Sequence, residues 1–440
     1  VHRLAHQPDQ LAADLEHDQI AARLAYDSGR MNRFAAIPGA IQHGVDVSDS
    51  ELYASDIPNY WTYARNFVLA DHFFSSVLGP SFPNHLFTVA AQSASADGNP
   101  PIPLWGCDAP RASTVEQRSA TGKLTQTYPC FDFRTLPDLL DARKIDWKYY
   151  APGKLQDGYI WSALDAIKHI RYGPDWQRNV VDYTQFARDA AAGRLPAVSW
   201  LVQPGGISDH PSASICAGEN WTVRQINAIM SNRQEWAHTA IILTWDDFGG
   251  LYDHMTPPST APGEIPNGFR VPTIVLSPYA RAGYVDHTVY TFSSIVKFVE
   301  SVLGLPSLTS SDARANNMFN AFDFARPPRP ALTLRPRDPC PGLPLDAGVT
   351  EPRIQAGRIQ TLIAHTAPGA DVEARVYPFA GKDFLVTGYA DVSGVVRLRF
   401  TVPPIPGSAR SAQDTVIVSS PYRNRDETVH FTVTPRAAGR

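Results

Sequence analysis

The chain has 440 residues, of which 43% are hydrophobic and 19% charged, and its formal net charge is −4. At roughly 150 residues per domain, this length predicts either two or three units or one large α/β domain with an appendage, and we expect the second. The charges form neither a basic stripe nor an acidic block, which excludes the electrostatic footprint of a nucleic-acid-binding protein, and no run approaches the ~20 apolar residues that a transmembrane helix needs.

The N-terminal region carries the first candidate functional residue, His17, in the segment DLEH at residues 14–17. A histidine here could act as a general acid or donate a hydrogen bond to developing negative charge, although a single histidine can equally be an ordinary polar residue. The sequence starts with Val1 and shows no charged-then-apolar leader. We therefore expect that a signal peptide or a longer N-terminal part has been removed.

A candidate nucleophile, Ser81, lies in the motif GPSFPNH at residues 79–85, before a predicted helix at residues 86–93. At or just before a helix N-terminus, unpaired N–H groups and the helix dipole favour an anion such as a phosphoryl group. A nearby cation could then make the hydroxyl nucleophilic, and Asn84 could donate to a phosphate oxygen. The alternative is structural, with Ser81 as an N-cap, proline in the first turn and Asn84 completing the cap.

The sequence has four cysteines, Cys107, Cys130, Cys216 and Cys340, which allow three pairings. Cys107 and Cys130 bracket a polar, turn-rich segment that a disulfide would close, so this pairing is favoured. No CxxC spacing is present, which makes a cysteine-bound zinc a poor interpretation. Disulfides indicate an oxidising compartment, and four buried free thiols are the alternative.

The candidate metal ligands follow the apolar run TAIILT at residues 239–244, in the motif WDDFGGLYDH at residues 245–254. Asp246 and Asp247 would normally point to opposite faces of a strand, but the glycine pair lets the backbone turn so that both can bind one cation. A turn that carries solvated acids is the alternative. An EF-hand is excluded because its alternating acid spacing is missing.

Two further histidines complete the candidate set. His210 lies in a loop directly after the strand-like residues 197–202, and His254 ends the acidic motif. Either could be a general acid or a donor to bound substrate, and either alone could be an ordinary polar residue. Together with Ser81 and the aspartate pair, these histidines provide the nucleophile, the metal ligands and the acid that phosphoryl transfer requires.

The first three quarters of the chain have an α/β pattern. Residues 239–244 and 272–277 are continuous apolar runs, typical of strands that are covered on both faces. Residues 292–303 predict a helix whose apolar face comprises Ile295, Val296, Phe298, Val299 and Val302. Strands that alternate with helices predict a mostly parallel sheet flanked by helices.

The composition changes at residues 327–344, which are too rich in proline for a helix or a central strand. Beyond them, apolar and polar residues alternate in short segments between turns, which predicts an immunoglobulin-like β-sandwich of about 90 residues; these segments are residues 353–365, 372–378, 394–401 and 428–433. We expect an α/β domain at residues 1–326, a linker at 327–352 and an all-β domain at 353–440.

Four stretches resemble, in order and spacing, a known protein family: RNFVLADHFFSSVLGPSFPNHLF, SDHPSASICAGENW, TAIILTWDDFGGLYDHMTPP and GFRVPTIVLSPYARAGYVDHTVYTFSSIVKFVE. It is the bacterial phosphoesterase family of non-haemolytic phospholipases C and a metal-dependent acid phosphatase, within the alkaline-phosphatase-like superfamily. The resemblance runs from about Asp14 to Glu300. It implies that Ser81, where many phospholipase relatives have Thr, is the nucleophile.

The resemblance also implies that Asp246 and Asp247 hold a divalent metal ion and that His210 and His17 line the phosphate site. Members of the family open with a strand ending in Glu-Asn-Arg, whose Glu and Asn complete the metal site. No residue before His17 matches this motif, and the pair at residues 219–220 belongs to a different block. We therefore expect an N-terminally truncated domain that binds metal weakly or not at all.

The expected activity is hydrolysis of a phosphate ester, in the manner of a phospholipase C, through a phosphoserine at Ser81. The expected substrate is a phosphodiester, with phospholipids as one candidate class, and a phosphomonoester is the alternative. A rival from another class is a non-catalytic surface protein, in which a decayed phosphoesterase fold presents the C-terminal sandwich to a cell surface or a carbohydrate. The expected location is extracellular or periplasmic.

Overall fold

The computed structural model describes residues 4–101, 104–119, 121–154, 156–258, 267–337, 340, 345–366, 371–391, 394–406, 409–419 and 427–435. The chain divides into two compact units. The larger unit comprises Leu15–Ala40 and Tyr53–Pro336, and the smaller unit comprises Val1–Asp14, Ile41–Leu52 and Arg337–Arg440.

The larger unit contains two sheets. Strands β11 (Ile241–Thr244), β12 (Thr273–Leu276), β5 (Val68–Ala70) and β13 (Tyr284–Asp286) form one sheet in that order. Strands β10 (Val198–Leu201), β8 (Trp147–Ala151) and β9 (Val180–Asp182) form the other. A separate hairpin joins β6 (Val115–Arg118) and β7 (Leu124–Thr127).

The predicted mostly parallel sheet is found only in part. The β10-β8-β9 sheet is parallel throughout and β13 runs parallel to β5, but β12 is antiparallel to both β11 and β5. An antiparallel pair needs no crossover helix, and the described residues between β11 and β12 form none. The unit is therefore a mixed α/β fold.

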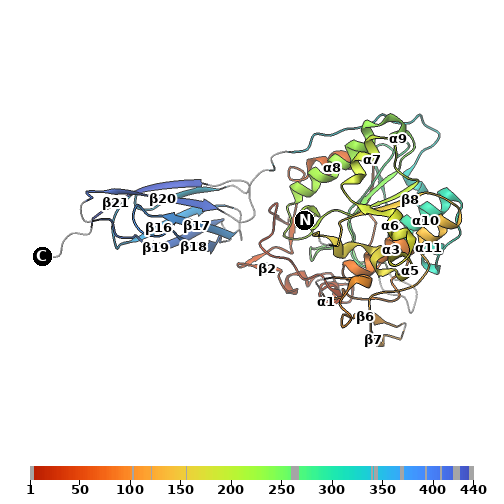
Figure 1. Cartoon of the computed structure of the whole chain (residues 1–440), viewed down its shortest axis with the longest axis horizontal. Coiled ribbons are helices and arrows are strands. Elements are labelled where there is room, and N and C mark those ends of the chain that lie inside the picture. Colours follow the sequence, from red (N-terminus) through yellow and green to blue (C-terminus); the bar gives the residue numbers. More distant parts are fainter. Residues whose placement is uncertain are drawn as a thin grey trace. The chain divides into compact units, whose positions relative to one another are not determined.

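The helices of the larger unit surround these sheets. Helices α7, α8 and α9 lie together along one margin of the unit (Figure 1). The bounds are α1 Gln19–Tyr26, α2 Pro58–Asn66, α3 Ser81–Ala90, α4 Leu136–Ala142, α5 Lys168–Arg171, α6 Pro174–Asn179, α7 Gln185–Ala191, α8 Ile215–Ser231, α9 Arg233–Ala237, α10 Phe292–Leu303 and α11 Ser310–Arg314. No helix among the described residues is long and apolar enough to span a membrane.

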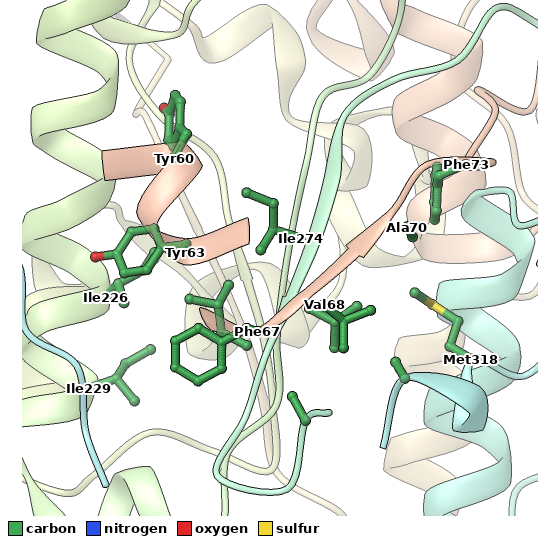
Figure 2. Packing of buried hydrophobic residues seen from close by; sticks show 14 of the residues in the cluster. Tyr60, Tyr63, Phe67, Val68, Ala70, Phe73, Ile226, Ile229, Ile274 and Met318 are labelled. Carbon is green, nitrogen blue, oxygen red and sulfur yellow. The ribbon is translucent and has the colours of Figure 1, made fainter. Parts of the chain in front are cut away.

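Two apolar clusters stabilise the larger unit. The first packs α2 and β5 against α8, and Figure 2 shows Tyr63 facing Ile226 while Phe67 lies between Ile229 and Val68. The second packs α3 against α4 and β8. Helix α10 has the predicted bounds and joins the two, because Phe292 belongs to the first cluster and Val296 to the second.

One expectation about an apolar surface needs correction. Val302 was expected on the apolar face of α10, but it is 56% exposed, whereas Val299 and Leu303 of the same helix pack against the second cluster. Residues 327–337 form no regular element, as their proline content predicts, yet they dock on α8 and α9: Asn227 exchanges two hydrogen bonds with the backbone of Leu334, and Trp236 Nε1 donates to the carbonyl of Arg329 at 3.1 Å.

The smaller unit contains a sandwich of two sheets. One sheet has the order β14-β16-β19 and the other β15-β21-β20-β17-β18; the bounds are β14 Asp346–Val349, β15 Arg353–Gln355, β16 Ile359–His365, β17 Asp371–Tyr377, β18 Phe384–Tyr389, β19 Val395–Thr401, β20 Ala412–Ser419 and β21 Glu427–Thr434. Inward residues of both sheets, such as Leu398 and Val416, share one core. The strands run lengthwise through this unit (Figure 1), and an immunoglobulin-like type stays a prediction.

Short strand pairs from the N-terminal part of the chain also belong to the smaller unit. Strand β1 (Ala5–His6) pairs in parallel with β4 (Ser50–Glu51), and β2 (Ile41–Gln42) pairs with β3 (Val45–Asp46).

The favoured disulfide is confirmed, because Cys107 and Cys130 are bonded in the larger unit. The described residues include no free cysteine, so the alternative of four free thiols is wrong.

Candidate active site

Ser81 is the first residue of helix α3. The N-cap is Pro80, which has extended backbone angles and makes no side-chain cap, so the serine is not the cap residue of the structural alternative. The Ser81 side chain is buried, with 3% exposure. Its position in the first turn places the hydroxyl at the positive end of the helix dipole, although the Phe82 N–H is already bonded to Oδ1 of Asn99 at 2.9 Å and Pro83 has no N–H.

The loop before Ser81 is shaped by Asn84. The Asn84 Oδ1 accepts a hydrogen bond from the Val77 amide at 2.9 Å, and Nδ2 donates to the carbonyls of Val77, Gly79 and Pro80 at 3.1 to 3.3 Å. The side chain is fully buried. These bonds fix the backbone that delivers Ser81, whereas a contact from Asn84 to a substrate stays a prediction.

The aspartate pair follows strand β11 at a sharp turn. Gly249 and Gly250 both have positive φ, 58° and 78°, and a Cβ atom on Gly250 would lie 2.5 Å from Cβ of Leu15. Glycine is therefore required at Gly250 for both conformation and space. This turn lets Oδ1 of Asp247 accept a hydrogen bond from the Gly249 amide at 2.8 Å, which orients the carboxylate.

Ser81 and the aspartate pair lie next to each other in the structure. The Ser81 hydroxyl donates to Oδ2 of Asp247 at 3.1 Å, across 166 positions of the sequence. One helical turn after Ser81, Nε2 of His85 lies 3.4 Å from Oδ2 of Asp246. Two carboxylates, one hydroxyl and one imidazole thus form a single cluster.

His85 was missed at the sequence level. The signal was available, because residues four apart on a helix lie on the same face. A nucleophile at Ser81 therefore places residue 85 beside the same ligands, and α3 runs unbroken through both positions.

The two carboxylates have opposite pKa shifts. Burial raises the pKa of Asp246, but the hydrogen bond and charge of His85, with smaller contributions from Ser81 and His17, hold it well below its usual range. Burial together with the negative charge of Asp246 raises the pKa of Asp247 to about 6. Two adjacent acids that resist carrying two charges are a natural binding site for a cation.

His17 and His210 lie side by side next to this cluster. Their ring centroids are 5.0 Å apart in an edge-to-face arrangement, and both rings act electrostatically on Asp247. Nδ1 of His17 contacts the carbonyl of Leu15 at 2.6 Å, and Nδ1 of His210 contacts the carbonyl of Pro211 at 2.9 Å. In each neutral ring Nδ1 is therefore the donor, which fixes the tautomer.

The His210 loop is held by residues that the sequence did not indicate. Asp209 has a positive φ of 63°, and its Oδ2 accepts a hydrogen bond from the Tyr60 hydroxyl at 2.8 Å. A Cβ atom on Gly218 of α8 would lie only 1.8 Å from Oδ1 of Asp209, so glycine leaves the space for this carboxylate. Trp161 packs on the His210 ring at 5.9 Å between centroids.

His254 lies outside these contacts. Its side chain is 71% exposed, and Nδ1 is 3.8 Å from Oδ1 of Asp253. Asp253 itself forms a bidentate ion pair with Arg270 at 2.6 and 2.9 Å. A role of His254 in substrate binding stays a prediction.

The residues present fit a divalent cation. Apart from the long contact with Nε2 of His85 at 3.4 Å, the buried Oδ2 of Asp246 has no hydrogen-bond partner among the residues that the structure describes, and such an oxygen is costly to bury unless a cation compensates it. Asp246 and Asp247 would be the ligands, and the hydroxyl oxygen of Ser81 lies beside them. The remaining ligands of a full oxygen shell would come from elsewhere.

Curated relatives are phospholipases C. The chain is 28% identical over 362 residues to phospholipase C A of Mycobacterium tuberculosis, covering 73% of this chain and 66% of that protein. It is 26% identical to the hemolytic phospholipase C of Pseudomonas aeruginosa, over 72% of this chain and 47% of that protein. It is 27% identical to non-specific phospholipase C6 of Arabidopsis thaliana, over 62% of this chain and 52% of that protein. The chain thus spans about half to two thirds of these relatives.

Similar solved structures are distant. A phosphonate monoester hydrolase from Silicibacter pomeroyi has 10% identity and a TM-score of 0.25, covering 78% of this chain and 84% of that one, which is too low to support a common fold. The sequence profile of the phosphoesterase family, in contrast, matches residues 2–306. This match covers more than half of the chain and contains Ser81, the aspartate pair, His17 and His210. The chain therefore belongs to the phosphoesterase family.

Proposed function

We propose that this chain hydrolyses phosphate esters in the manner of a phospholipase C, with a phosphodiester as substrate and Ser81 as nucleophile. The hydrogen bond from the Ser81 hydroxyl to Asp247 is the observation that carries the proposal, because it joins a helix-start hydroxyl to paired carboxylates. The similarity to phospholipases C supports the substrate class.

In the proposed reaction, Oγ of Ser81 attacks phosphorus and its proton passes to a neighbouring acceptor such as Asp247. The bond from phosphorus to the leaving alcohol breaks, and the imidazolium form of His210 or His17, which carries a second proton on Nε2, donates that proton to the leaving oxygen. Water then cleaves the phosphoserine, which restores the hydroxyl and releases the phosphorylated head group. A divalent cation held by Asp246 and Asp247 would supply positive charge for the hydroxyl and the phosphoryl oxygens.

The Cys107–Cys130 disulfide supports an extracellular or periplasmic location, because disulfides persist in oxidising compartments. This location belongs to the proposal. Contact with a cell surface or a carbohydrate through the smaller unit stays a prediction.

The proposal is tested with p-nitrophenyl phosphocholine and p-nitrophenyl phosphate, each assayed with Mg²⁺, Mn²⁺, Ca²⁺ or Zn²⁺. We expect faster turnover of the diester and loss of turnover in Ser81→Ala. The matched control is Ser76→Ala, because Ser76 is buried in the same loop and its hydroxyl has no hydrogen-bond partner among the described residues. Retained turnover in Ser81→Ala would overturn the nucleophile, and preference for the monoester would favour the acid phosphatase alternative.

A further inference from the structure

A second group of metal-ligating side chains lies at the end of the β5-β13 pair. The two strands are parallel, with Ala70 in register with Asp286. Asp71 and His72 directly follow β5, and His287 directly follows β13. Because parallel strands end at the same edge of a sheet, the three side chains emerge together.

Their ligand atoms converge. Oδ1 of Asp71 is 2.8 Å from Nδ1 of His72 and 2.9 Å from Nδ1 of His287, which is also 2.9 Å from Oδ2. The two imidazole rings are nearly perpendicular, with centroids 5.7 Å apart. One carboxylate and two ring nitrogens thus point to one location, within 4.8 Å of one another.

We propose that Asp71, His72 and His287 bind a zinc ion, with water as the fourth ligand. Two imidazoles and one carboxylate are a common zinc ligand set, whereas Ca²⁺ and Mg²⁺ prefer oxygen ligands alone. In a tetrahedral site with bonds of about 2.0–2.2 Å, ligand atoms lie roughly 3.3 Å apart. The distances from the Asp71 carboxylate to the two imidazole nitrogens therefore need to lengthen by only a few tenths of an ångström.

The three side chains are accessible enough to make this adjustment. His287 is 70% exposed, while Asp71 and His72 are 28% and 27% exposed. Without zinc, both Nδ1 atoms can donate to the carboxylate. When zinc binds to Nδ1, the ring proton of each neutral histidine moves to Nε2. Neither histidine therefore has to release a proton to the solvent.

The charges around the group are compatible with a cation. Burial opposes ionisation of Asp71, but hydrogen bonds from the two imidazoles outweigh it and lower the pKa of the carboxyl group. The guanidinium of Arg270 donates to the Asp71 carbonyl at 3.2 Å, and its charge is balanced by the ion pair with Asp253. Asp286, at the end of β13, adds a buried carboxylate that accepts from Tyr290.

This zinc site shares no residue with the Ser81 cluster. The zinc proposal and the proposed function at Ser81 can therefore be disproved independently of each other. The test measures zinc bound by the full chain after equilibrium dialysis, in the wild type and in an Asp246→Asn/Asp247→Asn background that removes the other site. In that background we expect one equivalent of zinc. His287→Ala should weaken binding by at least about 10-fold, while His238→Ala, another exposed histidine of the larger unit, should leave the affinity unchanged.

Co²⁺ substitution provides a second measurement. We expect visible absorption of a four-coordinate Co²⁺ in the double-asparagine background, lost in His287→Ala and in His72→Ala. Circular dichroism checks that each variant is folded, and the high exposure of His287 makes that variant the least disruptive. If the folded background variant binds no zinc, or if His287→Ala binds zinc as tightly as its parent, the site does not exist.

Discussion

The hydroxyl of Ser81 donates to Oδ2 of Asp247 at 3.1 Å, which links the first turn of α3 to the loop after β11. Residues that act as one unit in a reaction are not additive when removed. We therefore expect Ser81→Ala and Asp247→Asn each to lower kcat/KM by at least about 10³-fold. The double variant should be only slightly worse than either single variant.

This double-mutant cycle is measured on a chromogenic phosphodiester at saturating metal. Additive losses, with the double variant near the product of the two single effects, would mean that Ser81 and Asp247 act in separate steps. Ser76→Ala is the control for removal of a buried hydroxyl from the same loop.

Removal of His85 should weaken metal binding without removing the ligands. Nε2 of His85 lies 3.4 Å from Oδ2 of Asp246 and favours its ionised form. Loss of a partner that orients a metal ligand typically costs 10–100-fold in metal affinity. We expect His85→Ala to require about 10–100-fold more metal for half-maximal activity.

The metal titration of His85→Ala distinguishes this role from catalysis. A supporting role predicts that excess metal restores most of kcat, because Ser81 and both carboxylates remain. A loss of kcat that no metal concentration restores would place His85 in the chemical step instead. Treatment of the unmutated enzyme with a chelator should abolish activity, and readdition of metal should restore it.

His17 and His210 are predicted to share the work of proton donation and charge stabilisation. General acid catalysis contributes about 10²–10⁴-fold, so His17→Ala and His210→Ala should each lower kcat within that range. Tyr60→Phe removes only the hydroxyl that holds Asp209, and it should lower kcat less than His210→Ala does. If Tyr60→Phe and His210→Ala are equally inactive, Tyr60 itself is needed at the site.

The sequence predicted the site best where its signals were local. A strand followed by two aspartates and a glycine pair identified Asp246 and Asp247, and the positive φ of Gly249 and Gly250 has the expected cause. The helix expected at residues 86–93 instead comprises Ser81–Ala90, because proline is tolerated in the first turn of a helix. His85 was not predicted, although residues four apart on a helix lie on the same face.

The pairing of strands could not be predicted in the same way. The residues of β11 and β12 have apolar runs that suit a parallel strand as well as an antiparallel one. Their antiparallel register, with Thr244 opposite Thr273, depends on the path of the intervening chain. Likewise, the proline content of residues 327–337 indicates extended backbone, but the hydrogen bonds from Asn227 and Trp236 show where that backbone docks.

The Cys107–Cys130 disulfide closes a loop with a sequence separation of 23. In the chain-entropy view, a cross-link of this span stabilises the native state by about 3 kcal/mol. We expect Cys107→Ala/Cys130→Ala to lower the free energy of unfolding by about that amount, measured by urea denaturation. Tyr128 still donates to the carbonyl of residue 107, so the variant should fold, and an unchanged unfolding curve would contradict the prediction.

Glu300 predicts a pH dependence of stability. Its side chain is 1% exposed, and burial, with the hydrogen bond and charge of Asp312, raises its pKa from 4.5 to about 8. Between pH 4.5 and pH 8 the folded protein holds a proton that the unfolded chain has released. The stabilisation is therefore complete below pH 4.5 and is lost as the pH rises through about 8.

The prediction is measured as the difference in unfolding free energy between the wild type and Glu300→Gln at several pH values. As the pH rises, the unfolding free energy of the wild type should decrease relative to that of Glu300→Gln, by up to about 1.4 kcal/mol per pH unit for one proton. Glu16→Gln, which removes an exposed acid of the larger unit, should produce no such slope. A flat difference for Glu300→Gln would mean that Glu300 is ionised in the folded protein, and its hydrogen bond to Asp312 would then have to be absent.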